Sequence, residues 1–166
     1  MNRDTAISKL DLNQYKEHHI DRIVVSMDHV SVRPVVIVNK EELKNLVLDA
    51  HKINLEVAVN MLNFMMEEKI HVFEDVLLYC KEVGVDYIYY SDMGVYQIAS
   101  ELSIQDKMIY QPTTLIASSL DANHYLDLGI HTVVLSREIT FEEMKHILEK
   151  CKGCEIGVFG YNAMMH

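Results

Sequence analysis

An arginine and a glutamate stand side by side directly after an apolar run in the last third of the sequence. Arg137 and Glu138 follow residues 130–136, which have the β-branched content of a buried strand. Two charges held at the end of a buried strand require a partner or a ligand. Arg137 could bind a carboxylate through two hydrogen bonds, and Glu138 could act as a catalytic base. An exposed ion pair at the start of the next helix is the structural alternative.

Polar side chains follow the other apolar runs in the same way. They are Ser26, Asp28, His29 and Arg33, then Asn60 and Asn63, Ser91 and Asp92, Gln111, Thr113 and Thr114, Ser136, and finally Tyr161 and Asn162. In βα barrels, ligands bind at the carboxyl ends of the strands. We therefore expect Asp92 to be a second candidate base, and we expect substrate contacts from Arg33, Asn60, Ser91, Gln111, Thr113, Ser136 and Tyr161. Helix capping is the structural alternative for each Ser, Thr or Asp.

Short β-branched runs alternate with longer amphipathic stretches along the chain, the pattern of repeated βα units. Strands are expected at residues 20–26, 55–60, 85–91, 107–111, 130–136 and 155–160, with a weaker seventh at 4–8. Helices are expected at residues 40–52, 70–83, 94–102, 118–128 and 140–150. Thr140 and Glu143 have the spacing of a capping box, and Gly84 and Gly129 follow helix ends.

Three of the expected strands share one pattern and end in serine, which indicates an internal repeat. These strands are residues 20–26, 85–91 and 130–136. Repeated βα units in series predict an α/β fold, a parallel (βα) barrel of TIM type. A doubly wound sheet usually has a glycine-rich turn after its first strand, and this sequence has none. We expect residues 1–166 to form a single domain, a partial (βα)8 barrel truncated after six or seven strands. Its unpaired edge predicts self-association into an oligomer.

Composition and charge exclude several classes of protein. The 166 residues carry 15 Lys and Arg against 25 Asp and Glu, a formal net charge of −10, and the basic residues form no stripe. Nucleic-acid binding through a basic patch is therefore not expected. The N-terminus has no signal-peptide layout, and no apolar run approaches the roughly 20 residues of a membrane helix. With an odd number of cysteines, 3, the chain is expected to be cytoplasmic, without membrane contact.

Cysteine and histidine spacing predicts no metal site. Cys151 and Cys154 form a C-x-x-C at the end of an expected helix rather than at its start, so a turn with buried thiols is favoured over redox chemistry. Cys80 lies mid-helix and is expected in the core. The 9 histidines show neither H-x-x-x-H nor H-E-x-x-H spacing.

Residues 129–143 resemble a stretch of a known family. The run Gly-Ile-His-Thr-Val-Val-Leu-Ser-Arg-Glu-Ile-Thr, followed by Glu142 and Glu143, is similar to "G-V-x-x-V-V-L-S-R-E-L-T-x-E-E" of the collagenase-like peptidases, peptidase family U32. Residues 155–160 resemble the start of the family signature "E-x-F-x-x-G", and residues 161–166 look like its short, cysteine-poor branch. Residues 31–33 resemble the "F-S-x-R" loop. The resemblance spans roughly residues 20–166 and corresponds to the N-terminal portion of the family.

The resemblance implies a βα barrel, a peptidase activity and a set of site residues. The positions that carry over are Arg33, Asn60, Arg137, Glu138, Glu155 and Gly160, and Glu155 thereby joins the candidate substrate contacts. Other branches of the family hydroxylate RNA or quinone precursors with an iron–sulfur cluster. Where those branches have "G-x-x-C", this chain has Gly-Tyr-Asn-Ala at residues 160–163, so no cofactor is expected.

These observations lead to one functional expectation and one alternative. The expectation is hydrolysis of a peptide or a small anionic substrate at the carboxyl ends of the strands. The alternative is a non-catalytic barrel protein that binds a small anionic metabolite or a peptide of a partner protein.

Overall fold

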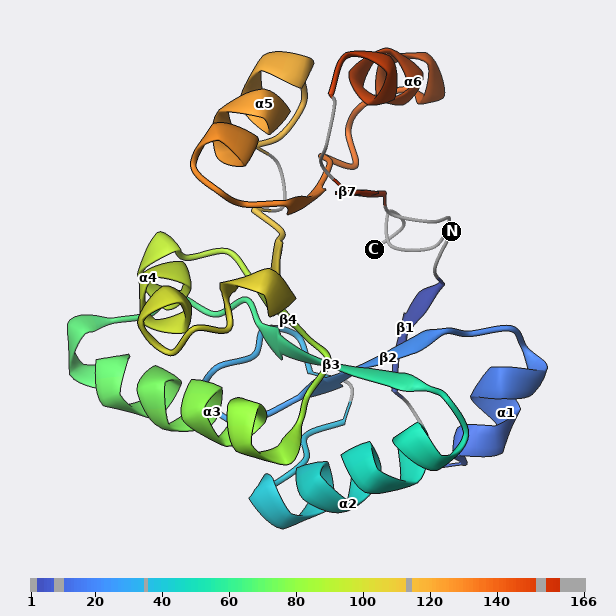
Figure 1. Cartoon of the computed structure of the whole chain (residues 1–166), viewed down its shortest axis with the longest axis vertical. Helices are drawn as coiled ribbons and strands as arrows, with labels where there is room; N and C mark the ends of the chain where they lie inside the picture. Colours follow the sequence, from blue (N-terminus) through green and yellow to red (C-terminus); the bar gives the residue numbers. More distant parts are fainter. Residues whose placement is uncertain (1–2, 8–10, 35, 113–114, 152–154, 159–166) are drawn as a thin grey trace. The chain divides into compact units, whose positions relative to one another are not determined.

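The structure, a computed structural model, describes residues 3–7, 11–34, 36–112, 115–151 and 155–158 and divides the chain into two compact units (Figure 1). Unit 1 is Met1–Lys107 and unit 2 is Met108–His166. In both units parallel strands alternate with helices, which confirms the predicted α/β class. The expectation of a single domain stays a prediction.

Unit 1 contains four strands whose order in the sheet follows their order in the chain. Its elements are β1 (Asp4–Ala6), α1 (Leu12–Glu17), β2 (Arg22–Ser26), α2 (Lys40–Lys52), β3 (Glu56–Met61), η1 (Glu67–Lys69), α3 (Ile70–Val83), β4 (Tyr87–Tyr90), α4 (Met93–Glu101) and η2 (Gln105–Lys107). The parallel register places Ala6 beside Val24, Ser26 beside Asn60, and Met61 beside Tyr90. A doubly wound sheet would reverse its strand order, so this order supports the barrel type.

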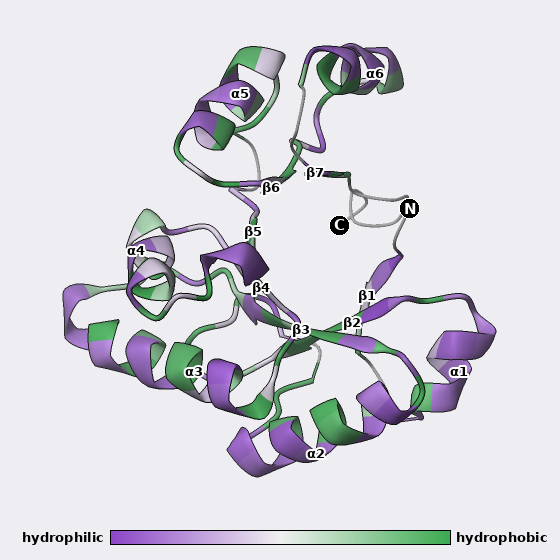
Figure 2. Cartoon of the chain, viewed as in Figure 1, coloured by the Kyte–Doolittle hydropathy of each residue, from purple (hydrophilic) through white to green (hydrophobic). Residues whose placement is uncertain are grey.

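The two faces of the unit 1 sheet differ in character, because side chains alternate along each strand. Ile23, Val57 and Ile88 lie on one face of the sheet and are buried. Figure 1 shows α2 and α3 running along one face of this sheet. These helices contribute four buried side chains each, from Leu43 to Ala50 and from Phe73 to Cys80. Figure 2 shows polar residues along the outer sides of both helices. The core of unit 1 therefore lies between the sheet and these helices.

Local signals set the helix ends where the sequence predicts them. Asn39 caps α2 through a capping box with Glu42, in which Glu42 N donates to Asn39 Oδ1 at 3.0 Å and Asn39 N donates to Glu42 Oε2 at 2.8 Å. Gly84 ends α3 at φ 80°, a conformation that glycine adopts without a steric penalty. The predicted bounds of α2 and α3 are confirmed to the residue.

Unit 2 continues the same alternation of parallel strands and helices. Its elements are β5 (Met108–Tyr110), α5 (Ser119–Asp127), β6 (Thr132–Val134), α6 (Phe141–Lys150) and β7 (Glu155–Gly157). The register pairs Tyr110 with Val133 and Val134 with Gly157. The predicted capping box at Thr140 and Glu143 is confirmed, and Gly129 follows α5 at φ 86°. All seven predicted strands are present, several of them shorter than expected.

Candidate functional site

The carboxyl ends of β2, β3 and β4 form one edge of the unit 1 sheet, called here the carboxyl edge of unit 1. Ser26 and Asn60 are direct neighbours in the β2–β3 register, and Ser91 follows Tyr90, which is paired with Met61. The structure therefore brings Ser26, Asn60 and Ser91 to the same edge, as the sequence predicts.

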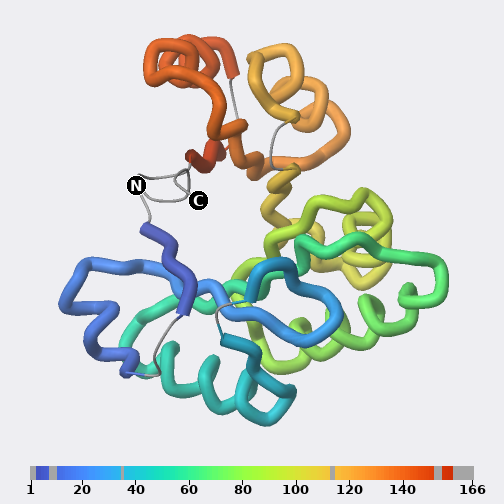
Figure 3. The backbone as a smooth tube through the Cα atoms, turned by 180° about the vertical axis from the view of Figure 1, so that it is seen from behind, coloured from blue at the N-terminus to red at the C-terminus, as the bar shows by residue number. Residues whose placement is uncertain are grey.

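Asn60 and Ser31 connect the loop between β2 and α2 to the end of β3. Figure 3 shows this loop from the side opposite to Figure 1. The Asn60 amide donates to Val32 O at 3.0 Å and accepts from Leu62 N at 3.1 Å. The Ser31 hydroxyl accepts from Met27 N at 2.9 Å and donates to Asn60 O. Because the two side chains bind backbone groups of both the β2–α2 loop and the β3–α3 loop, they fix the positions of these loops relative to each other.

Asn63 makes a second connection between the same loops. Its side chain donates to His29 O at 2.8 Å, and its backbone N donates to Val30 O at 3.0 Å. His29 and Arg33 both have positive φ, 66° and 47°, which is uncommon for residues other than glycine. Such conformations persist where surrounding contacts determine them, and they cluster at ligand sites. The hydrogen bonds from Ser31, Asn60 and Asn63 supply those contacts and present Arg33 on the surface.

Asp92 lies between the β3–α3 loop and the start of α4. Its Oδ1 accepts from Gly94 N at 2.8 Å, which makes Asp92 the N-cap of α4, and its Oδ2 accepts from Met65 N at 3.3 Å. Ser91 donates to Leu62 O at 3.1 Å in the same region. A Cβ added to Gly94 would lie 2.4 Å from Met65 Cε, so the glycine permits this close approach. Asp92 thus makes the helix-cap contacts of the structural alternative.

Substitutions at Asp92 separate a capping role from a catalytic one. We expect Asp92→Ala to lower the free energy of unfolding by about 1–2 kcal/mol. Asp92→Asn should lower it by less, because asparagine is as good an N-cap as aspartate, although its amide nitrogen cannot accept the hydrogen bond from Met65 N. Urea denaturation followed by circular dichroism measures both values. If Asp92→Asn abolishes turnover while the unfolding free energy is retained, Asp92 is the catalytic base and not merely a cap.

The predicted charged pair of unit 2 follows β6. Ser136 is 3% exposed, its N donates to Ile116 O at 2.8 Å, and its hydroxyl accepts from Glu138 N at 3.3 Å. Arg137 is half-buried, and Glu138 is exposed with no hydrogen bond or ion pair from its carboxylate to any residue of the described ranges. Gln111 follows β5, whose partner β6 runs parallel to it, so Gln111 and Ser136 lie at one edge of unit 2. Thr113, Tyr161 and Gly160 lie outside the described residues.

Glu155 lies at the other edge of unit 2. It is the first residue of β7, it pairs with Thr132 at the start of β6, and its N donates to His131 O at 2.8 Å. The Thr132 hydroxyl is 3.5 Å from Glu155 Oε2. The amino and carboxyl ends of parallel strands face opposite edges, so the structure does not bring Glu155 to Ser136 or Gln111.

A buried arginine, Arg22, lies on the face of the unit 1 sheet opposite Ile23, called here the inner face, and the sequence pattern does not predict it as a functional residue. The Arg22 side chain is 7% exposed and binds Asp4 Oδ2 at 3.0 Å and Glu56 Oε2 at 2.9 Å. Its guanidinium carbon lies 3.6 Å from the centre of the Tyr87 ring, and the Tyr89 hydroxyl donates to Asp4. An arginine within a strand that is otherwise apolar is the signal that could have revealed this cluster.

The electrostatics of this cluster follow from burial and pairing. Burial opposes the charge of Arg22, but Asp4 and Glu56 raise its pKa above the ordinary value. Burial, together with the hydrogen bond to Asp4, raises the pKa of Tyr89 as well. Both groups therefore keep their protons across the physiological range. The cluster joins all four strands of unit 1 away from the carboxyl edge.

Cys80 and Cys151 are both buried, as the sequence indicates for these two residues. Burial raises the pKa of the Cys80 thiol to about 12, which makes it unreactive at neutral pH. Cys151 is buried, and its thiol lies 3.2 Å from Asn123 Oδ1, whereas Cys154 lies outside the described residues. Within the described ranges, no three His, Cys, Asp or Glu side chains are grouped so that they could hold a metal ion. Nor does any helix there have the length and apolar character needed to cross a membrane.

Two curated proteins resemble this chain over about two thirds of its length. One is "Uncharacterized protease MJ0090" of Methanocaldococcus jannaschii, 30% identical over 113 residues, which are 68% of this chain and 27% of that protein. The other is "tRNA hydroxylation protein P" of Helicobacter pylori, 22% identical over 115 residues, which are 69% of this chain and 27% of that protein. The chain thus spans about a quarter of the length of these relatives.

A solved structure and a family comparison agree with these relatives. "The Structure of the U32 Peptidase Mk0906" matches with a TM-score of 0.71 at 20% identity, and covers 95% of this chain and 68% of the other. This likeness confirms the predicted fold, a parallel βα barrel of TIM type, of which the described residues contain seven strands. Residues 9–166 match the family model described as Peptidase family U32, nearly the whole sequence. The chain therefore belongs to peptidase family U32.

Proposed function

We propose that this protein hydrolyses peptides, with the substrate bound at the carboxyl ends of the barrel strands. The observation that carries the proposal is the family match over residues 9–166. The relative that is 30% identical has a name that describes a protease, which supports the same activity. The carboxyl ends of parallel βα strands are where this fold type places its ligands.

In this proposal Arg137 binds a carboxylate of the substrate and Glu138 is the general base. Glu138 accepts a proton from the attacking water, oxygen bonds to the peptide carbonyl carbon, and the C–N bond breaks as the proton passes to the leaving amine. The exposed carboxylate of Glu138 supports this role, because both oxygens of the other candidate base, Asp92, already accept hydrogen bonds from backbone N–H groups.

Candidate substrate contacts come from both units and are assigned to each unit separately. In unit 1 they are Arg33, Asn60 and Ser91, where Asn60 and Ser91 hold the loops and Arg33 is exposed beside them. In unit 2 they are Gln111 and Ser136, and Thr113 and Tyr161 remain predictions outside the described residues. Glu155 lies at the amino-terminal edge of the unit 2 strands, so its position does not support a contact with a substrate bound at their carboxyl ends.

The alternative is a barrel protein without catalysis that binds a small anionic metabolite or a partner's peptide. The H. pylori relative adds RNA as a ligand class to consider, but the net charge of −10 on this chain disfavours contact with phosphates. No cofactor is part of the proposal. We also propose that the protein forms an oligomer and is located in the cytoplasm.

Substitution of Arg137 tests substrate binding directly. We expect Arg137→Ala to raise KM for peptides with a free carboxylate by about 10-fold or more, with Arg137→Lys intermediate, because lysine keeps the charge but loses the two-bond geometry. The assay measures cleavage of a fluorescence-quenched peptide library by the longest gene product that contains this sequence. Unchanged KM and kcat in Arg137→Ala would overturn this role, and ligand-dependent stabilisation without any product would favour the binding protein.

A further inference from the structure

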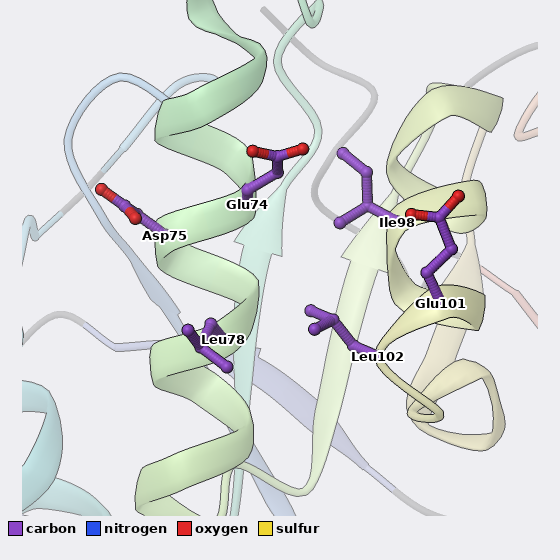
Figure 4. Close-up of a pocket in the computed structure, with 6 residues that line it drawn as sticks. All are labelled: Glu74, Asp75, Leu78, Ile98, Glu101 and Leu102. Carbon is purple, nitrogen blue, oxygen red and sulfur yellow. The ribbon is translucent and has the colours of Figure 1, made fainter.

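A groove runs along the outer surface of unit 1 between α3 and α4. It has a volume of about 270 Å³ and is lined by Glu74, Asp75 and Leu78 of α3 and by Ile98, Glu101 and Leu102 at the end of α4 (Figure 4). Figure 4 shows the aliphatic side chains of Leu78, Ile98 and Leu102 facing one another across the gap. The groove lies on the helix layer and is separate from the candidate site at the strand ends.

The floor of the groove is aliphatic and uncovered. Leu78 is 45% exposed, while Ile98 and Leu102 are half-buried. The neighbouring seam between α2 and α3 is closed differently: the Tyr79 hydroxyl donates to Lys40 O at 2.6 Å, and Lys40 Nζ lies 5.1 Å from the centre of the Tyr79 ring. In the described residues, the α3–α4 groove has no aromatic side chain of this kind among those that line it.

The rim of the groove is negatively charged. Glu74, Asp75 and Glu101 are exposed, and none of the three forms an ion pair with a residue of the described ranges. Glu101 is the last residue of α4, where the partial negative charge of the helix end disfavours a carboxylate. Gln97 donates to Glu101 at 3.0 Å. Lys81 Nζ donates to Leu102 O at 2.8 Å, so the positive charge of Lys81 lies at the C-terminal end of α4. The three carboxylates therefore give the rim a negative charge that no cation of the described residues pairs with.

We propose that the α3–α4 groove binds a basic amphipathic α-helix of a partner protein. An aliphatic side chain of that helix fills the space among Leu78, Ile98 and Leu102, and flanking Lys or Arg side chains pair with Glu74, Asp75 and Glu101. The fit rests on charge complementarity between the acidic rim and a basic partner, and on the packing of a helix into a groove between two helices. It is independent of the proposed peptidase activity.

A synthetic peptide of this chemistry tests the proposal. The probe is an 18-residue fluorescein-labelled helix with Leu at helical i, i+3, i+4 and i+7 spacing and Lys beside the leucines, and binding is followed by fluorescence anisotropy. We expect Leu78→Glu to weaken binding about tenfold or more, because it removes the aliphatic contact. We expect the double variant Glu74→Gln with Asp75→Asn to weaken binding by a similar factor, because it removes two of the charge pairs. A scrambled peptide of the same composition is expected to bind weakly.

Matched control variants separate groove binding from attraction to an acidic protein. Leu48→Glu changes another exposed leucine of a unit 1 helix, and Glu142→Gln with Glu149→Gln removes two exposed carboxylates of unit 2. Both are expected to leave binding unchanged. If Leu78→Glu fails to fold, Glu101→Lys provides the test instead. A lysine is favourable at the C-terminal end of α4, so we expect unchanged or higher thermal stability together with loss of peptide binding.

Four outcomes would overturn the proposal. Equal binding of the scrambled peptide, or equal loss in the control variants, would show attraction by net charge alone. Retained binding in Glu101→Lys would show that the groove is not used. A dimer in light scattering that the peptide dissociates, and that Leu78→Glu also dissociates, would show that the groove is occupied by a second copy of this chain.

Discussion

Glu138→Gln is expected to lower kcat for peptide cleavage by about 10²–10⁴-fold, the range that a positioned general base contributes. Glutamine retains the size of glutamate and the backbone bond from residue 138 N to the Ser136 hydroxyl, so the local structure should be preserved. Because the Glu138 side chain is exposed, the free energy of unfolding should change by less than about 0.5 kcal/mol. Single-turnover cleavage and urea denaturation of the same preparation measure both quantities.

The control for this variant is Glu142→Gln, a neighbouring exposed carboxylate in the first turn of α6. Its turnover should equal that of the unchanged protein. Loss of activity in Asp92→Asn but not in Glu138→Gln would assign the base to unit 1 instead. Full activity in both variants would show that neither Glu138 nor Asp92 is the general base. Absence of any product with the unchanged protein would favour the non-catalytic binding protein.

The main elements of the fold could be predicted because their signals are local. The helix over α2 has its capping residues in the sequence at Asn39 and Glu42, and the end of α3 is marked by Gly84. α1 was not predicted, since it has six residues and none of them is buried, so it shows no apolar periodicity. η1 and η2, of three residues each, are missed for the same reason.

The candidate site could be predicted where a residue's position follows from the end of a strand. Ser91 and Asp92 follow β4 and Ser136 follows β6, as expected. Glu155 was selected by family resemblance, although its position as the first residue of an expected strand already indicates the amino edge. The register with Thr132 places it at that edge, and its contact with substrate stays a prediction.

Interactions between distant strands could not be predicted in the same way. Tyr89 and Asp4 are 85 residues apart, and Arg22 and Glu56 are 34 residues apart. Hydrophobic periodicity indicates which face of a strand is buried, but the pairing register decides which charges meet. The β1–β2 and β2–β3 registers place Arg22 directly between Asp4 and Glu56, and this information appears first in the structure.

Arg22→Met is expected to lower the free energy of unfolding by about 2–4 kcal/mol. The substitution keeps much of the side-chain volume but leaves Asp4 and Glu56 without the cation between them, and breaking a buried pair costs about 3–5 kcal/mol. The expected loss is smaller because the Asp4 and Glu56 side chains are 24% and 39% exposed, so water screens part of the repulsion. Urea denaturation at neutral pH and low salt measures it.

A triple variant shows whether uncompensated charge causes that loss. Arg22→Met with Asp4→Asn and Glu56→Gln should recover most of the lost stability, because no unpaired charge is left on the inner face. Lys52→Met is the matched control: the Lys52–Asp49 pair has side chains 72% and 60% exposed, and its loss should cost less than about 0.5 kcal/mol. If the triple variant is as unstable as Arg22→Met, then the lost packing of the guanidinium on Tyr87, rather than unpaired charge, accounts for the loss of stability.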